Sequence, residues 1–243
     1  MGARRFFVEN AHALGDLVPI VGSDAHKIVH VLRLRDGDSI ELVDSSAHAF
    51  DAKLEIAGER VGARLERVRE AAPRDGVVVD VAQGVPKGQK MDFVVEKLTE
   101  LGVAEILPLV SERTVVRDVG DAKLERWRRL ARGAAQQSGR SDIPAVAEPI
   151  AFDELLARMG SYDLVLLPWE VAEPENLRER LARLLAEASR VLVVIGPEGG
   201  FSHAEAERAQ AAGAQLVSLG SRILRSETAG LVTLVLVRHH TSK

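Results

Sequence analysis

The stretch at residues 195–202, Ile-Gly-Pro-Glu-Gly-Gly-Phe-Ser, crowds glycine, proline and a carboxylate into one short loop. It follows an apolar run, and Ser202 with Glu205 forms a capping box that marks the start of a helix. Pro197 removes one backbone N–H and Glu198 adds a negative charge, so the loop disfavours a phosphate ligand and leaves room for a nucleoside-like or cationic one. The alternative is a tight turn that needs glycine only for positive φ.

Two other loops place polar residues directly after apolar runs. Residues 219–229 follow a strand-like run at 215–218 and carry Arg225 and Glu227 within otherwise apolar sequence. These two charges either serve a ligand or simply pair with each other. Residues 166–170, Leu-Leu-Pro-Trp-Glu, follow another apolar run. Ligands of open α/β sheets bind beyond the carboxyl ends of the strands, so we expect the three loops to form one pocket.

The elements that must position these loops alternate along the second part of the chain. Amphipathic helices are predicted at 90–101 and 121–137, and buried strands at 77–81, 104–110, 163–167 and 191–195. This alternation predicts an α/β fold, with a parallel sheet that has helices on both faces. The segment 228–237 is apolar almost all round a helical wheel. We expect a helix buried in a homodimer contact, although its valines also suit a strand.

Residues 1–70 have a different pattern, with short strand-like runs at 5–8, 39–43, 50–56 and 61–68 and one amphipathic helix near 24–32. Several short strands with a single helix indicate a small β-barrel. Residues 71–76, Ala-Ala-Pro-Arg-Asp-Gly, then read as a linker.

Composition excludes several classes of protein. The 243 residues include no cysteine, which rules out disulfides, cysteine-ligated zinc, iron–sulfur clusters and thiol nucleophiles. No apolar run approaches the roughly 20 residues that span a bilayer, and the N-terminus lacks the apolar stretch of a secretory signal. We therefore expect a soluble cytoplasmic protein without a membrane partner. His26 and His30 are spaced as on one helix face, but no metalloprotease-like carboxylate lies between them, so no metal site is predicted.

The net charge of −4 hides a local basic cluster between residues 113 and 140. Eight basic residues against three acidic ones give this segment a net charge of +5: Arg113, Arg117, Lys123, Arg126, Arg128, Arg129, Arg132 and Arg140 against Asp118, Asp121 and Glu125. Arginine suits bidentate binding of phosphate, although a solvated helix face would carry the same charges.

Two of these segments together resemble the ribosomal RNA small subunit methyltransferase E family. They are Gly-Pro-Glu-Gly-Gly-Phe-Ser at 196–202 and Leu-Gly-Ser-Arg-Ile-Leu-Arg-Ser-Glu-Thr-Ala at 219–229. The likeness covers nearly the whole chain, since Arg-Arg-Phe-Phe at 4–7, His-Val-Leu-Arg at 30–33, Lys-Gly-Gln-Lys-Met-Asp at 87–92 and Gln-Ser-Gly-Arg at 137–140 follow in family order. Each short motif is weak alone, whereas their order and spacing are specific. Ser226 departs from the threonine of many members but keeps the hydroxyl.

The resemblance implies a methyltransferase of the SPOUT class, which methylates N3 of a uridine in 16S rRNA of the small ribosomal subunit. It implies S-adenosylmethionine as the methyl donor, bound in a trefoil knot near the C-terminus, and a homodimer with its sites near the interface. It also implies a PUA-like β-barrel that holds RNA over residues 1–72 and a SPOUT methyltransferase domain over 73–243. The donor carries a sulfonium cation and no phosphate, in agreement with the loop chemistry above.

The uridine N3 proton must leave as the methyl group arrives, so the reaction needs a base or a group that stabilises the resulting anion. Glu198 and Glu227 are the candidate bases, which the sequence does not rank, and Arg225 is the candidate partner of a uracil oxygen. The candidate donor contacts are Leu167, Gly196, Gly200, Leu219, Gly220, Ile223, Leu224 and Arg225. The candidate RNA phosphate contacts are Arg4, Arg5, Arg33, Arg35, Lys87, Lys90 and Arg140, for each of which a surface ion pair is the alternative.

Two other functions stay open at this level. One is a SPOUT methyltransferase that acts on another rRNA nucleotide or on tRNA. The other is a non-catalytic RNA-binding assembly factor that kept the fold, which would not bind S-adenosylmethionine.

Overall fold

The computed structural model describes residues 4–69, 76–116, 118–172 and 177–241. The chain folds into two compact units, Met1–Pro73 with Ala135–Asp142, and Arg74–Ala134 with Ile143–Lys243. The predicted linker at 71–76 and the boundary at 72/73 lie almost wholly outside the described residues, as does Arg117 of the basic cluster.

The N-terminal unit holds a five-stranded sheet in the order β1-β3-β4-β5-β2. The strands are β1 (Arg5–Phe7), β2 (Leu17–Ile20), β3 (Ser39–Val43), β4 (Ala49–Ala57) and β5 (Arg60–Arg69), all antiparallel except for the β1–β3 pair. The predicted helix is present as α1 (Gly22–His26), which continues into a π-helix, η1 (Lys27–Val31). Sequence patterns missed β2, whose Pro19 is tolerated because the strand lies at a sheet edge.

The second unit is the predicted parallel sheet with helices on both faces. Seven strands lie in the order β12-β10-β11-β6-β7-β8, with β9 also on β7, and every pair is parallel. The strands are β6 (Val78–Gly84), β7 (Glu105–Val110), β8 (Ala145–Val146), β9 (Ile150–Ala151), β10 (Leu164–Pro168), β11 (Arg190–Ile195) and β12 (Gln215–Val217). The helices are α2 (Lys90–Glu100), α3 (Asp121–Ser138), α4 (Phe152–Arg158), η2 (Met159–Ser161), α5 (Leu177–Leu184), α6 (His203–Ala211) and α7 (Ser226–Thr241).

Two hydrophobic clusters cover the two faces of this sheet. One packs Val79, Val193 and Ile195 of the sheet against α2, α3, α5 and α7, and the other packs Val165 and Leu192 against α4 and α6. Strands buried on both faces read as continuous apolar runs, which is why the sequence showed no alternation there.

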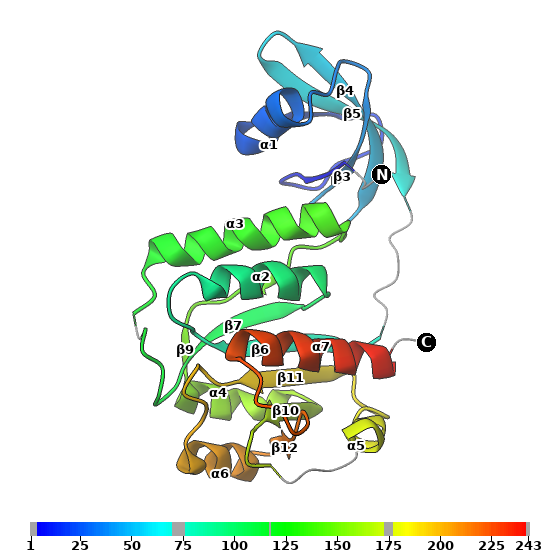
Figure 1. Cartoon of the computed structure of the whole chain (residues 1–243). Helices are drawn as coiled ribbons and strands as arrows, with labels where there is room; N and C mark the ends of the chain where they lie inside the picture. The colour runs from blue at the N-terminus through cyan, green and yellow to red at the C-terminus, as the bar shows by residue number, and fades with distance from the viewer. Residues whose placement is uncertain (1–3, 70–75, 117, 173–176, 242–243) are drawn as a thin grey trace. The chain divides into compact units, whose positions relative to one another are not determined.

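The C-terminal segment is a helix, so the strand alternative is wrong. From β12 at the edge of the sheet the chain returns to its middle, where α7 packs against β6, β11 and α2, as Figure 1 shows (α7 in red). Gly230, Thr233, Leu234 and Val237 form the buried side of α7, whereas Val235 remains exposed. The core of the unit therefore covers one side of this apolar helix.

An ion pair between a buried carboxylate and a half-exposed arginine lies near the amino-terminal end of the central strands. Asp80 of β6 is buried and accepts a hydrogen bond of 2.9 Å from Arg190 of β11, whose guanidinium lies 4.8 Å from the ring centroid of Tyr162. Burial, followed by the negative charge of Asp80, raises the pKa of Tyr162 well above its usual value.

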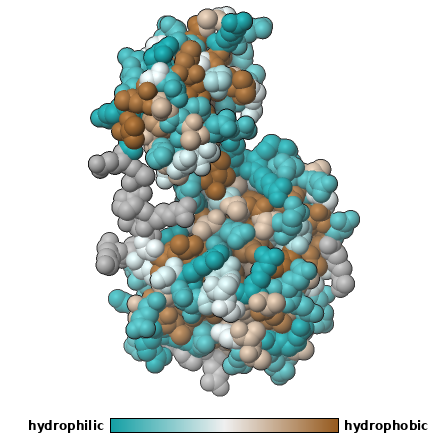
Figure 2. Space-filling view, turned by 180° about the vertical axis from the view of Figure 1, so that it is seen from behind, coloured by the Kyte–Doolittle hydropathy of each residue, from teal (hydrophilic) through white to brown (hydrophobic). Residues whose placement is uncertain are grey.

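None of the described helices is long and apolar enough to cross a bilayer. On the face shown in Figure 2, hydrophobic residues are scattered among hydrophilic ones.

Candidate functional site

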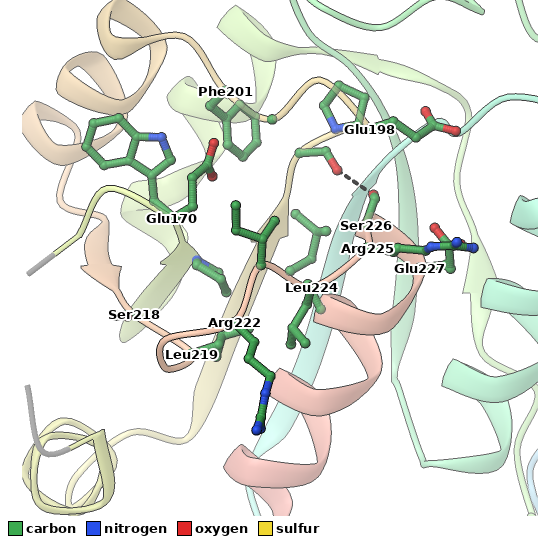
Figure 3. Close-up of a pocket in the computed structure, with 18 of the residues that line it drawn as sticks. Glu170, Glu198, Phe201, Ser218, Leu219, Arg222, Leu224, Arg225, Ser226 and Glu227 are labelled. Atoms are coloured by element: carbon green, nitrogen blue, oxygen red, sulfur yellow. Dashed lines mark hydrogen bonds and ion pairs between the residues drawn. The ribbon is translucent and has the colours of Figure 1, made fainter. Parts of the chain in front are cut away.

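The loops that follow β10, β11 and β12 enclose one pocket of about 540 Å³, as predicted from their places at the strand ends. Lys90 of α2 and the start of α7 complete its wall. Figure 3 shows Glu170 and Phe201 on one side of the cavity and Arg225 and Glu227 on the other. The lining residues are Lys90, Pro168, Trp169, Glu170, Ala172, 195–201, 218–227 and Ala229.

The loop after β11 is held by close backbone packing. A Cβ atom on Gly84 of β6 would lie 2.6 Å from the carbonyl carbon of Gly196 and 2.9 Å from Cδ of Pro197, so only glycine fits there. Gly200 has a φ of 64°, which favours glycine, and its N–H donates to the Pro197 carbonyl at 2.9 Å. The glycines of this loop therefore serve both turn geometry and close approach.

A short buried hydrogen-bond chain joins this loop to α7. Ser226 Oγ donates to the Gly196 carbonyl at 2.5 Å (dashed in Figure 3) and accepts from Nε2 of Gln83 at 2.8 Å. Ser226 and Gln83 are both buried. The hydroxyl at position 226 thus ties the second loop to the first and to β6.

Glu198 is held by two nitrogen donors. Its Oε1 atom accepts from the Lys87 backbone N–H at 3.0 Å and from Nζ of Lys90 at 3.0 Å. Partial burial alone would raise the pKa of Glu198, but these hydrogen bonds and the charge of Lys90 outweigh it, so the pKa lies below its usual value. A carboxylate that is ionised and already hydrogen-bonded is a weak proton acceptor.

Glu227 has the opposite environment. Its side chain is only 13% exposed, and its Oε2 atom is buried without a hydrogen-bond partner among the described residues. Its Oε1 atom lies 4.0 Å from Nζ of Lys90 and 3.9 Å from Nη1 of Arg225, which is 81% exposed. The Arg225–Glu227 pair is too long for a hydrogen bond, so pairing alone does not account for these two residues.

The structure brings most of the predicted donor contacts together. Those that line the pocket are Gly196, Gly200, Leu219, Gly220, Ile223, Leu224 and Arg225. Leu167 does not, because its side chain is fully buried among Leu109, Phe201 and other residues of the core. Successive side chains of a strand point to opposite faces, so Pro168, which follows Leu167, lines the cavity instead. Trp169 and Glu170, which come directly after β10, line it as well. Their position after a strand was the available signal for these residues.

The predicted RNA contacts fall into two groups. Arg5 pairs with Glu41 at 2.8 Å and donates to the Gly139 carbonyl, and Arg140 pairs with Asp142 at 2.9 Å. For these two the ion-pair alternative describes what the structure shows. Arg4, Arg33, Arg35 and Lys87 are exposed, and Lys90 is engaged with Glu198.

The basic cluster is partly neutralised by neighbouring carboxylates. Arg126 pairs with Asp92 at 2.7 Å, and Arg128 pairs with Glu125 and Glu148 at 2.8 and 3.0 Å. In the part of the chain that the structure describes, no three metal-binding side chains lie together. His26 of α1 and His30 of η1 lie side by side, with ring centroids 4.7 Å apart.

Two family models match the chain. That of the RNA methyltransferase domain matches residues 73–238, and that of the RNA methyltransferase PUA domain matches residues 22–60. The relative in Bacillus subtilis, ribosomal RNA small subunit methyltransferase E, is 32% identical over 98% of this chain and 97% of its own length. The protein of the same name in Synechocystis is 34% identical over 96% of this chain and 76% of its own length.

Solved structures agree with these relatives. Ribosomal RNA small subunit methyltransferase E from Neisseria gonorrhoeae, bound to S-adenosyl methionine, has a TM-score of 0.88 with 30% identity and covers 98% of this chain and 97% of its own. A putative methyltransferase from Legionella pneumophila, in complex with the same cofactor, has a TM-score of 0.87 with 28% identity and covers 98% of both chains. This chain therefore belongs to the ribosomal RNA small subunit methyltransferase E family.

Proposed function

We propose that this chain transfers a methyl group from S-adenosylmethionine to N3 of a uridine in 16S rRNA of the small ribosomal subunit. Family membership and the cofactor seen in the Neisseria and Legionella structures support the donor and the RNA substrate. The observation that carries the proposal is the pocket beyond β10, β11 and β12, which places Glu227 and Arg225 beside a cavity large enough for a small ligand.

The lining residues fit this donor. Leu219, Ile223 and Leu224 offer an apolar wall for an adenine ring, and the carboxylates of Glu170 and Glu227 favour a cation over an anion. Among the described residues Glu170 has no hydrogen bond or ion pair, so its charge is available to a ligand. When bound, S-adenosylmethionine supplies a methyl group on a positively charged sulfur, which becomes neutral as that methyl leaves.

Glu227 is the better candidate for the base. As the bond between N3 and the methyl carbon forms, the N3–H bond breaks, and its proton passes to the carboxylate of Glu227, which lines the pocket and has one oxygen without a hydrogen-bond partner among the described residues. Glu198 keeps its loop in place through Lys87 and Lys90 rather than accepting a proton. The exposed Arg225 stabilises the negative charge that develops on a uracil oxygen.

The acceptor must leave its helix or be single-stranded, because N3 lies on the base-pairing edge of uracil. We assign Arg4, Arg33, Arg35, Lys87 and Lys90 to phosphates of the surrounding RNA, with Lys87 and Lys90 next to the reacting groups. Arg5 and Arg140 keep their carboxylate partners in this assignment.

We extend the proposal to the domains and the assembly. Residues 1–72 act as a PUA-like barrel that holds RNA and 73–243 as the catalytic SPOUT domain, whose return from β12 to the middle of the sheet is the path expected of a trefoil knot. The exposed Val235 of α7 and Ile223, which is 86% exposed, support a homodimer near the site. The protein would work in the cytoplasm, where ribosomal subunits are found.

Reverse transcription tests the proposal. Small subunits from a strain that lacks the gene are incubated with the protein and S-adenosylmethionine, and the 16S rRNA is then copied. Because N3 methylation removes the pairing donor, we expect a new stop at one uridine. A stop at a guanosine, no stop at all, or methylation of tRNA instead would contradict the assignment. If calorimetry detected no binding of S-adenosylmethionine, the protein would be a non-catalytic assembly factor.

A further inference from the structure

Arg113 lies against the Glu198 loop but is not part of the pocket wall. Its Nη1 atom donates to the Gly199 carbonyl at 2.8 Å, and its side chain is exposed. Among the described residues no other hydrogen bond or ion pair involves Arg113. A guanidinium has five N–H donors, so most of those on Arg113 face no protein acceptor.

The turn that carries Arg113 is fixed on both sides of it. Ser111 and Thr114 are buried, and the Ser111 N–H donates to Thr114 Oγ1 at 2.9 Å. Between them, the Glu112 N–H donates to the buried Glu205 at 2.8 Å, and Glu112 accepts from Ser202 Oγ at 2.8 Å. These bonds tie the turn after β7 to the start of α6, so the backbone of Arg113 is held at one place.

Gly199 leaves the space that Arg113 occupies. A Cβ atom at position 199 would lie 3.2 Å from Cβ of Arg113 and 3.4 Å from its Cδ, which is tighter than ordinary contact. The φ of Gly199 is not in the positive range, so turn geometry does not demand glycine here. The two neighbouring glycines thus have different roles: Gly200 shapes the turn, and Gly199 lets the arginine stem lie across the loop.

We propose that Arg113 binds a phosphate of the RNA beside the target nucleotide and so positions the base at the pocket, an inference that rests on the proposed function. The carboxylates of Glu198 and Glu227 line the pocket, and their negative charges repel an RNA backbone. A guanidinium on a rigid turn offsets this repulsion and grips a phosphate through two parallel N–H bonds. The carboxylate of the methyl donor is a less suitable partner, because Arg113 lies outside the residues that line the pocket.

The test compares Arg113→Met with Arg183→Met, which removes another exposed cation, from α5. Binding of 16S rRNA is measured by fluorescence at several salt concentrations, and binding of S-adenosylmethionine by calorimetry. We expect Arg113→Met to weaken RNA binding by about tenfold. The slope of log K against log salt is negative, and its magnitude should fall by about one. Donor affinity should stay within about twofold of the original protein, and Arg183→Met should change neither quantity.

Arg113→Lys refines the test, because lysine keeps the positive charge but cannot form the bidentate hydrogen bonds of a guanidinium. It should restore the salt slope and only part of the RNA affinity. An unchanged slope in Arg113→Met, or a loss of donor affinity that parallels the loss of RNA affinity, would overturn the inference and make Arg113 a loop anchor or a donor contact. If the original protein binds neither donor nor RNA, the proposed function fails as well; if it binds both and only the slope result is negative, this inference alone fails.

Discussion

Replacing Ser226 with alanine removes the hydroxyl that joins three parts of the site. The change leaves the Gly196 carbonyl without its 2.5 Å donor and Nε2 of Gln83 without its 2.8 Å acceptor. Stranding a buried polar group costs about 1–3 kcal/mol. Gln83 keeps a longer bond of 3.3 Å to the Gly84 carbonyl, so we expect a total loss of about 2–4 kcal/mol in the free energy of unfolding.

Urea unfolding followed by tryptophan fluorescence measures this loss in the relevant unit, because both tryptophans, Trp127 and Trp169, lie in it. Ser161→Ala is the matched control, since Ser161 is exposed and donates only to the nearby Arg158 carbonyl. Affinity for S-adenosylmethionine should fall in Ser226→Ala and not in the control, because Gly196 lines the pocket. Equal stability of the two variants would refute the role of the hydroxyl.

Other predictions address packing, ionisation and the base. In urea unfolding, Gly84→Ala should lower the free energy of unfolding by about 3 kcal/mol or more, because the new Cβ atom would meet backbone atoms. Gly133→Ala in α3, where the space is open, should raise it by about 0.5–1 kcal/mol. Similar changes in the two variants would contradict the close approach at Gly84. Tyr162, the only tyrosine, has a raised pKa, so absorbance at alkaline pH should show no tyrosinate until the protein unfolds. Its contribution to stability is complete below pH about 10 and declines above it; titration at the ordinary pKa would refute its burial. Glu227→Gln should lower kcat by about 10²–10⁴-fold, which is more than its effect on donor affinity. Glu198→Gln should lower kcat less, and the reverse order would make Glu198 the base.

The sequence predicted the parallel sheet well because its strands are buried on both faces. Continuous apolar runs such as the one in β11 need no partner to be recognised, and loops that follow parallel strands must meet at one edge. The pocket and most of its lining residues followed from that rule alone. The helical state of α7 was also predicted, although its valines suited a strand as well.

Other features depend on contacts between residues far apart in the chain. Neither the order of the strands nor the approach of Gly84 to Pro197 leaves a periodic signal. Ranking Glu198 and Glu227 as candidate bases required knowledge of the hydrogen-bond donors around Glu198. Leu167 shows the same limit on a smaller scale, because a strand end was visible in the sequence but the residue at which the chain turns into the pocket was not.

We propose that the pocket beyond β10, β11 and β12 serves methyl transfer to uridine N3. The most direct measurement uses S-adenosylmethionine with a labelled methyl group, small ribosomal subunits that lack the modification, and mass spectrometry of the digested 16S rRNA. We predict label in one nucleotide, 3-methyluridine, and almost none with Glu227→Gln. Label in another nucleoside, or equal labelling with that variant, would contradict the account.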